Sequence, residues 1–185
     1  MTATEEKTKI FWFLDVDGVI NAFPTHKNRS KYKRGRATPF YYGTGVYGSL
    51  DNFMYKINYD PTVLERMRAL HESGKVELVW LTTWGAGANG GLRTLVGLPE
   101  LRVAGEMEDP KYRGLHWWKD QALQDWMEEH PGARFIWTDD HLSMYLTEEE
   151  LEQRLGTDGL AICTPETTGL THEDLDRIEE FINAE

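Results

Sequence analysis

Three short apolar runs in this sequence each end abruptly in side chains that carry oxygen. The junctions are residues 11–14 followed by Asp15-Val16-Asp17-Gly18, residues 76–81 followed by Thr82-Thr83, and residues 133–138 followed by Asp139-Asp140. Such runs predict strands, and the helix signals between them predict a parallel sheet covered by helices. Because the carboxyl ends of parallel strands lie at one edge of a sheet, we expect these polar side chains to converge there.

The pattern of runs and caps predicts the architecture. Strands are expected at residues 10–14, 76–81, 101–104, 134–138 and 160–164, with helices beginning at Pro61, at about residues 92 and 115, and after the capping residues Thr147 and Thr171. The fold class is therefore α/β: a Rossmann-like, doubly wound, mainly parallel five-stranded sheet with helices on both faces. We expect one domain over residues 1–185, with a small loop or hairpin insertion at about 22–59 after the first strand.

Composition excludes several classes of protein. No apolar stretch is long enough to cross a membrane, and the polar first residues lack the centre of a signal peptide, so a cytoplasmic protein is expected. The lone cysteine, Cys163, stands in an apolar run and is expected to be a buried structural thiol. The histidines and this cysteine show no zinc spacing. Trp12, Trp80 and Trp137 lie within the predicted strands and are expected in the core.

The insertion carries a charge opposite to that of the whole chain. The net charge is −11, yet six basic residues and no acidic residue lie between Asp17 and Asp51. The segment also contains aromatic residues: Tyr32, Phe40, Tyr41, Tyr42 and Tyr47. Because cations hold phosphates and aromatic rings stack on bases, this basic flap suits a large phosphorylated substrate, with Lys31, Lys33 and Arg34 as candidate contacts. The alternative is a solvated loop that balances an acidic domain.

The order of the motifs is more specific than any one of them. A hydrophobic run with D-x-D-G-V, a hydrophobic run with Thr, a helix with Lys119 near its start, and a hydrophobic run with Asp-Asp follow one another. This order resembles the haloacid dehalogenase superfamily of phosphotransferases over nearly the whole chain. The Asp139-Asp140 pair also looks like the fourth motif of polynucleotide 3′-phosphatases and of similar domains attached to RNA repair proteins.

The resemblance implies a role for each motif residue. Asp15 would attack phosphorus and form an aspartyl-phosphate, and Asp17 would protonate the leaving oxygen and then deprotonate the attacking water. Thr82 would donate a hydrogen bond to the phosphoryl group, with Thr83 as the fallback and, with Trp84, a candidate substrate contact. Lys119 would pair with the phosphoryl group and the nucleophile, and Lys111 is the alternative lysine.

The resemblance also implies a hard divalent ion, Mg²⁺, because all the expected ligands are oxygens. The ligands would be the Asp15 side chain, the Asp17 carbonyl and one of Asp139 and Asp140. Adjacent residues cannot both point straight into the crevice, so one would bind directly, with Asp140 favoured.

The expected function is Mg²⁺-dependent hydrolysis of a phosphomonoester, with a nucleotide or a phosphorylated nucleic-acid end as substrate. Neither interval between motifs has room for a large cap, so the crevice should be open. A small-metabolite phosphatase fits equally well if the insertion is only a solvated loop. A third possibility is a binding module that sequesters a phosphate or nucleotide without turnover. The sequence does not determine the oligomeric state.

Overall fold

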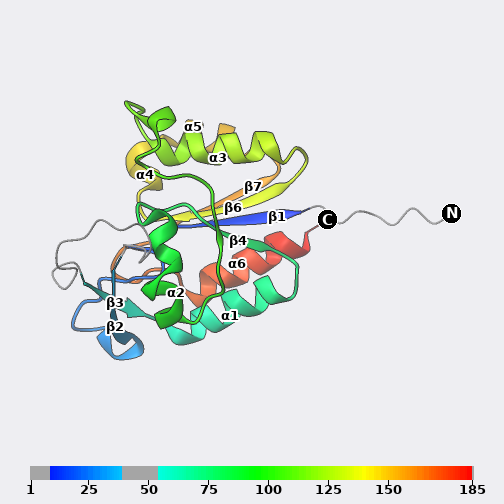
Figure 1. The fold of residues 1–185 in the computed structure, drawn as a ribbon. Coiled ribbons are helices and arrows are strands. Elements are labelled where there is room, and N and C mark those ends of the chain that lie inside the picture. Colours follow the sequence, from blue (N-terminus) through cyan, green and yellow to red (C-terminus); the bar gives the residue numbers. More distant parts are fainter. Residues whose placement is uncertain (1–8, 39–53, 185) are drawn as a thin grey trace.

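A computed structural model describes residues 9–38 and 54–184 (Figure 1). Its centre is a five-stranded parallel sheet in the order β5-β4-β1-β6-β7. The strands are β1 (Ile10–Leu14), β4 (Glu77–Trp80), β5 (Arg102–Val103), β6 (Arg134–Asp139) and β7 (Gly159–Cys163). The predicted Rossmann-like α/β class is confirmed, and β1 lies at the middle of the sheet between β4 and β6.

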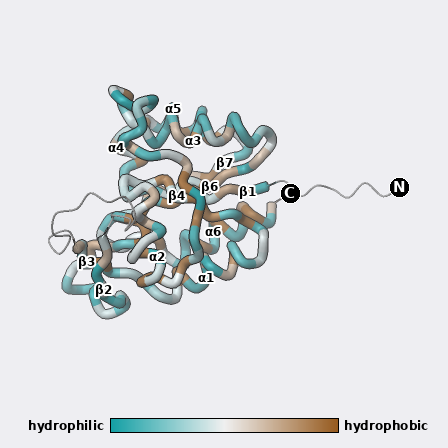
Figure 2. The backbone as a smooth tube through the Cα atoms, in the orientation of Figure 1, coloured by the Kyte–Doolittle hydropathy of each residue, from teal (hydrophilic) through white to brown (hydrophobic). Residues whose placement is uncertain are grey.

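Helices cover both faces of this sheet. Figure 1 shows α1 and α6 on one face and α3 with α5 on the other. The α-helices are α1 (Pro61–Glu72), α2 (Gly91–Val96), α3 (Trp118–Glu129), α4 (Leu142–Tyr145), α5 (Glu148–Leu155) and α6 (His172–Asn183), and the short 3-10 helices are η1 (Arg29–Lys31), η3 (Gly85–Asn89) and η4 (Pro110–Tyr112). Helices α1 and α3 alternate between hydrophilic and hydrophobic residues along their length (Figure 2), as expected for helices packed on a sheet.

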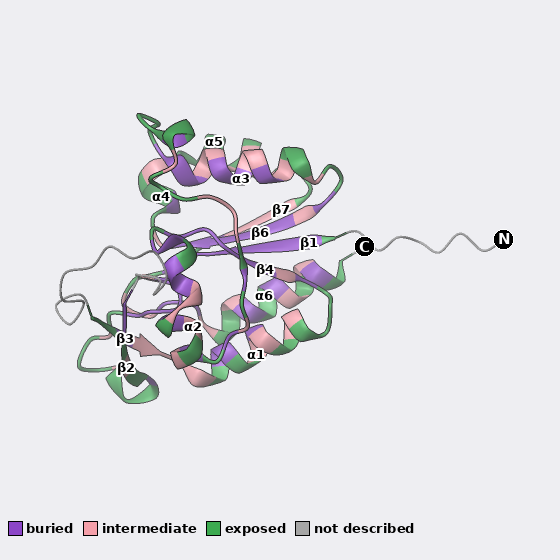
Figure 3. Ribbon diagram, viewed as in Figure 1, coloured by how far each residue is buried: buried purple, intermediate pink, exposed green. Residues whose placement is uncertain are grey.

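Strand β1 supplies both apolar layers, because its side chains alternate between the faces. Trp12 and Leu14 pack with residues of α1 and α6, whereas Phe11 and Phe13 pack with residues of α3. Strand β1 is buried along its whole length, and β6 is buried after its first residue (Figure 3). Trp12, Trp80 and Trp137 are fully buried, which confirms that the strand tryptophans belong to the core.

The insertion after β1 contains a hairpin, one of the two forms that the sequence left open. Strands β2 (Lys33–Ala37) and β3 (Tyr55–Tyr59) pair antiparallel. Gly35 lies opposite the buried Ile57, and the hairpin packs against α2 (Figure 1). Of the aromatic residues expected in the basic flap, Tyr32 is buried, whereas Phe40, Tyr41, Tyr42 and Tyr47 lie outside the described residues.

The expectation for Cys163 was wrong, since its side chain is exposed. Cys163 is the last residue of β7, and β7 is an edge strand with a neighbouring strand on one side alone. The apolar run around it therefore did not imply burial at its final position. Among the described residues, no helix is long and apolar enough to span a bilayer.

Candidate active site

Side chains from three adjacent strands meet at the carboxyl edge of the sheet. Asp15 directly follows β1, Asp139 ends β6, and Thr82 follows β4 by two residues. The Asp15 N–H donates to the carbonyl of Thr138, at 3.1 Å, so the parallel ladder continues to the first carboxylate. The structure thus brings together the three motifs that the sequence placed at strand ends, at the edge where ligands bind in open α/β sheets.

Lys119 connects two of the carboxylates. It is the second residue of α3 and only 3% exposed, and its Nζ lies 2.6 Å from Asp15 Oδ2 and 2.6 Å from Asp139 Oδ2. Burial lowers the pKa of Lys119, but the negative charges of Asp15 and Asp139 outweigh that effect and raise it. The lysine is therefore a cation at neutral pH, with a carboxylate on either side.

The alternative lysine lies elsewhere. Lys111 belongs to η4, is exposed, and pairs with Asp125 at 3.2 Å. Among the described residues, the three carboxyl groups that cluster at the carboxyl edge are those of Asp15, Asp139 and Asp140, and Lys111 pairs with none of them.

Asp139 and Asp140 have different surroundings although they are adjacent. Asp139 is fully buried; its Oδ2 faces Lys119 and its Oδ1 accepts the His141 N–H at 2.8 Å. Burial, reinforced by the charge of Asp15, raises the pKa of Asp139 to about 7 against the opposing charge of Lys119. By contrast, the buried Oδ1 of Asp140 accepts no hydrogen bond from the described residues, although His141 Nδ1 lies 3.3 Å away.

A cation would fit this cluster. Oxygen or nitrogen atoms of Asp15, Asp139, Asp140 and His141 all lie within 4.8 Å of one another. The unsatisfied Asp140 oxygen is the observation that favours a metal here, because a buried carboxylate oxygen normally has a partner. His141 was not predicted; its place directly after the Asp139-Asp140 pair was the available signal.

Gly18 allows Asp140 to approach the first motif. It has a φ of +74°, and a Cβ at this position would overlap the Asp140 carboxylate. The Gly18 carbonyl accepts a hydrogen bond from Thr164 Oγ1 at 2.6 Å, which fastens the turn to the segment after β7. The glycine of the D-x-D-G motif is thus required both for its backbone conformation and for the space of the neighbouring carboxylate.

Asp17 is held apart from the lysine-bridged pair. Its Oδ1 accepts a hydrogen bond from Asn21 Nδ2 at 2.7 Å, and its Oδ2 accepts one from Trp84 Nε1 at 2.9 Å. Asn21 was not predicted as a site residue, although it lies one helical turn's spacing after Asp17 in the sequence. Trp84, expected to contact substrate, is 6% exposed and directs its indole N–H at Asp17.

The two threonines after β4 differ in exposure. Thr82 is fully buried, and its Oγ1 accepts the Trp84 N–H at 3.3 Å. Thr83 is exposed.

The predicted basic contacts lie on the hairpin and the turn before it. Lys31, Lys33 and Arg34 are exposed, and Lys31 lies 3.9 Å from Asp60. Arg34, Arg36 and Lys56 share the outer face of the hairpin, since Arg36 is paired with Lys56 and side chains alternate along a strand. Within the described parts of the chain, none of these three cations has an acidic partner within 4 Å.

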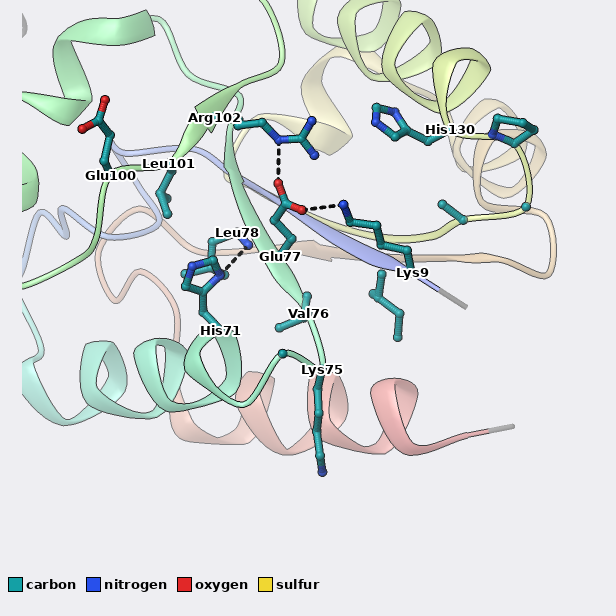
Figure 4. A pocket seen from close by; sticks show the side chains of 15 residues that line it. Lys9, His71, Lys75, Val76, Glu77, Leu78, Glu100, Leu101, Arg102 and His130 are labelled. Atoms are coloured by element: carbon teal, nitrogen blue, oxygen red, sulfur yellow. Dashed lines mark hydrogen bonds and ion pairs between the residues drawn. The ribbon is translucent and has the colours of Figure 1, made fainter. Parts of the chain in front are cut away.

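A cavity lies at the opposite, amino-terminal edge of the sheet (Figure 4). It measures about 820 Å³, and in it Glu77 pairs with Arg102 at 2.6 Å and with Lys9 at 2.8 Å. These three charged groups are thus paired with one another, and the motif carboxylates are at the other edge. The candidate site is therefore the cluster of Asp15, Lys119 and Asp139 at the carboxyl edge.

Comparison with known proteins identifies the family of the chain. The family model described as the HAD (haloacid dehalogenase) domain in Swiss Army Knife RNA repair proteins matches residues 11–175, a span that contains every motif named above. No curated protein and no solved structure matches the chain. The resemblance to the haloacid dehalogenase superfamily is confirmed, and the chain belongs to the family of HAD domains found in Swiss Army Knife RNA repair proteins.

Proposed function

We propose that this protein is a Mg²⁺-dependent phosphomonoester hydrolase that works through an aspartyl-phosphate on Asp15. The observation that carries the proposal is the buried Lys119, which lies 2.6 Å from both Asp15 and Asp139 at the ends of neighbouring strands. Burying two carboxylates and an ammonium group is costly unless they are paired, and perturbed ionisable groups of this kind cluster at functional sites. Membership of a HAD family supports the same class of reaction.

A divalent cation would be held by the Asp15 side chain, the Asp17 carbonyl and Asp140. Asp140 is favoured over Asp139 as the direct ligand, because Lys119 and the His141 N–H already occupy both oxygens of Asp139. The ion would supply positive charge that offsets the repulsion between the anionic nucleophile and an anionic phosphate. Asp139 would then act indirectly, by holding Lys119 in place.

Four side chains would carry out the reaction itself: those of Asp15, Asp17, Lys119 and Thr82. An Asp15 oxygen forms a bond to phosphorus while the bond from phosphorus to the leaving oxygen breaks, and Asp17 gives its proton to that oxygen. Asp17 then takes a proton from the water that attacks the aspartyl-phosphate, which releases phosphate and restores Asp15. Lys119 would hold Asp15 in position and neutralise phosphoryl charge, and Thr82 would donate a hydrogen bond to a phosphoryl oxygen.

The substrate we propose is a phosphorylated nucleic-acid end or a nucleotide. Exposed cations of the hairpin and the preceding turn, Lys31, Lys33 and Arg34, would contact its phosphates. The family's occurrence in RNA repair proteins supports a nucleic-acid substrate over a small metabolite.

The test is phosphate release from a panel that spans an aryl phosphate, mononucleotides, and 3′- and 5′-phosphorylated oligonucleotides, with Mg²⁺ or EDTA. We expect release that requires metal and is lost in Asp15→Asn. Absence of release from every substrate by folded wild-type protein would contradict the hydrolase and favour a binding module.

The substrate class is tested by replacing Lys31, Lys33 and Arg34 together with Ser. Activity on an oligonucleotide should fall more than activity on the aryl phosphate, because only the longer substrate reaches the hairpin. The matched control replaces three exposed cations elsewhere, Lys75, Lys111 and Arg177, with Ser. Equal losses on both substrates in the hairpin variant would contradict the proposal that the substrate is a nucleic acid.

A further inference from the structure

Both carboxylate oxygens of Asp17 are held by side-chain donors from different segments. Asn21 Nδ2 donates to Oδ1 at 2.7 Å, and Trp84 Nε1 donates to Oδ2 at 2.9 Å. Two hydrogen bonds from opposite partners fix both the position and the plane of a carboxylate. Asp17 is therefore held in one orientation, although it is only half-buried.

The direction of both hydrogen bonds is determined by chemistry. An indole N–H can only donate. The Asn21 amide is oriented by a second bond, because its Oδ1 accepts the Asn58 N–H at 2.9 Å, which leaves the Nδ2 end to face Asp17. Neither donor can take a proton from Asp17 at these atoms, so they serve to place the carboxylate rather than to exchange protons with it.

Each donor is also connected to the basic hairpin. Asn58 belongs to β3, and two further bonds join it to the first-motif loop: its carbonyl accepts the Ala22 N–H at 2.8 Å, and its Nδ2 donates to the Ala22 carbonyl at 3.0 Å. Tyr55, at the start of β3, lies with its ring 5.7 Å from the Trp84 ring. The hairpin thus reaches Asp17 by two routes, through Asn21 and through Trp84.

We infer that Trp84 and Asn21 are positioning residues for Asp17 and that they fasten it to the β2–β3 hairpin. The inference rests on the proposed function, in which Asp17 passes a proton to the leaving oxygen. The hairpin that would hold the substrate's phosphates then also sets where that proton is delivered. Trp84 would act by positioning Asp17 and would not itself contact the reacting atoms.

The experiment compares kcat/KM on two substrates that differ in their need for a proton. Expulsion of 4-nitrophenolate needs little protonation, whereas a nucleoside monophosphate releases an alkoxide that needs a full proton. Trp84→Phe keeps a ring beside Tyr55 but removes the N–H. We expect kcat/KM on the nucleotide to fall about tenfold or more, because misplacing a catalytic group by a small distance is costly, and kcat/KM on 4-nitrophenyl phosphate to change much less.

Asn21→Leu provides a second, independent variant with the same expected pattern, and Tyr55→Leu should show a weaker form of it. The matched control is Trp80→Phe, which loses an equivalent indole bond, 2.9 Å long, to Asn89 rather than to a carboxylate. The control should affect the two substrates equally. Thermal unfolding of every variant separates loss of folding from loss of positioning.

The outcomes distinguish failure of the positioning inference from failure of the proposed function. If wild-type protein hydrolyses both substrates and Asp17→Asn selectively loses the nucleotide, the proposed function holds. Equal losses on both substrates in Trp84→Phe and Asn21→Leu would then overturn the positioning inference alone. If wild-type protein hydrolyses neither substrate, the proposed function fails and this inference fails with it.

Discussion

Lys119 is a buried cation whose removal would leave two carboxylates facing each other. Breaking a buried ion pair from one side costs about 3–5 kcal/mol. We expect Lys119→Met to lose about 3 kcal/mol of unfolding free energy without metal, and to lose nearly all hydrolytic activity. Urea unfolding with EDTA measures the first effect, and phosphate release measures the second.

Lys111→Met is the control for that variant, because Lys111 is exposed and pairs with Asp125 outside the site. Its stability should change by less than about 1 kcal/mol, and its activity should stay at the wild-type level. Comparable losses of stability and activity in the two variants would contradict a specific role for Lys119 in the site.

Gly18 is the second residue on which the geometry depends. Gly18→Ala forces a side chain into the left-handed region, at a φ of +74°, and into the volume of the Asp140 carboxylate. We expect activity to fall at least about tenfold, since small displacements of a site residue are costly, and stability to fall by about 1–3 kcal/mol. Gly74→Ala is a matched control, because Gly74 also has a positive φ, +71°, but has open space around its Cβ position. Both variants should be destabilised, and Gly18→Ala alone should lose activity.

At the scale of single residues, the sequence was informative where the polar group ends a strand. The convergence of Asp15, Thr82 and Asp139 followed from strand ends, and that of Lys119 from the family resemblance. The contact of Trp84 with Asp17 joins residues 67 apart, and no local pattern encodes such a pairing. Asn21 lies only four residues after Asp17, but its amide is oriented by Asn58, which is 37 residues further along the chain. The role of each of these residues remains a prediction.

The hairpin is positioned by its contact with α2. A Cβ on Gly35 would overlap the Leu95 side chain, so glycine lets the two elements pack closely. We expect Gly35→Ala to cost about 1–3 kcal/mol through overpacking, and Leu95→Ala to relieve part of that cost in the double variant. A double-mutant cycle of thermal or urea unfolding tests this coupling, and purely additive effects would contradict the contact.

Glu77 joins the amino ends of neighbouring strands through Arg102 of β5 and Lys9 before β1 (Figure 4). Burial raises the pKa of Glu77, but the hydrogen bonds from Arg102 and Lys9 outweigh it, so the pKa lies below its ordinary value of 4.5. The ionised form is therefore favoured by folding, and its stabilisation is present above the unfolded pKa and lost as pH falls through the folded pKa.

We expect Glu77→Gln to cost about 1 kcal/mol near neutral pH. Wild type and variant should converge in stability as the pH falls below 4.5. Urea unfolding of both proteins across this range measures the difference, and a gap independent of pH would contradict the ion pairs.

At the scale of elements, apolar runs located the five central strands closely, because a buried parallel strand is a nearly continuous hydrophobic segment. Strand β1 has the predicted bounds, and β7 begins and ends one residue earlier than expected. The sequence did not locate strands β2 and β3. Strand β2 in particular, Lys33–Ala37, is short, charged and exposed over most of its length, so it lacks the apolar pattern that predicts a strand. Burial of Ile57 and the close approach of Gly35 to Leu95 hold them, and both are tertiary contacts.

The molecule as a whole separates its charges. The net charge is −11, whereas the hairpin region supplies exposed cations beside the carboxyl edge of the sheet. A nucleic-acid strand would be repelled by most of the surface and attracted to this region, so binding should weaken steeply with salt.

Asp15→Asn protein should therefore bind a phosphorylated single-stranded oligonucleotide with a negative slope of log K against log salt. Replacing Lys31, Lys33 and Arg34 with Ser should reduce that slope by about 2, at about 0.7 per lost phosphate contact. Fluorescence anisotropy over a salt series measures the slope. An unchanged slope would place the nucleic acid on another surface.

The position of Cys163 makes the protein easy to observe. It is the sole cysteine of the chain, it is exposed, and its Sγ lies 3.5 Å from the carbonyl oxygen of Asp140. A maleimide fluorophore would attach at this one atom without any mutation and would stand beside the residue favoured as a metal ligand. The native chain therefore carries its own labelling site, from which emission could report cation and substrate arrival in real time.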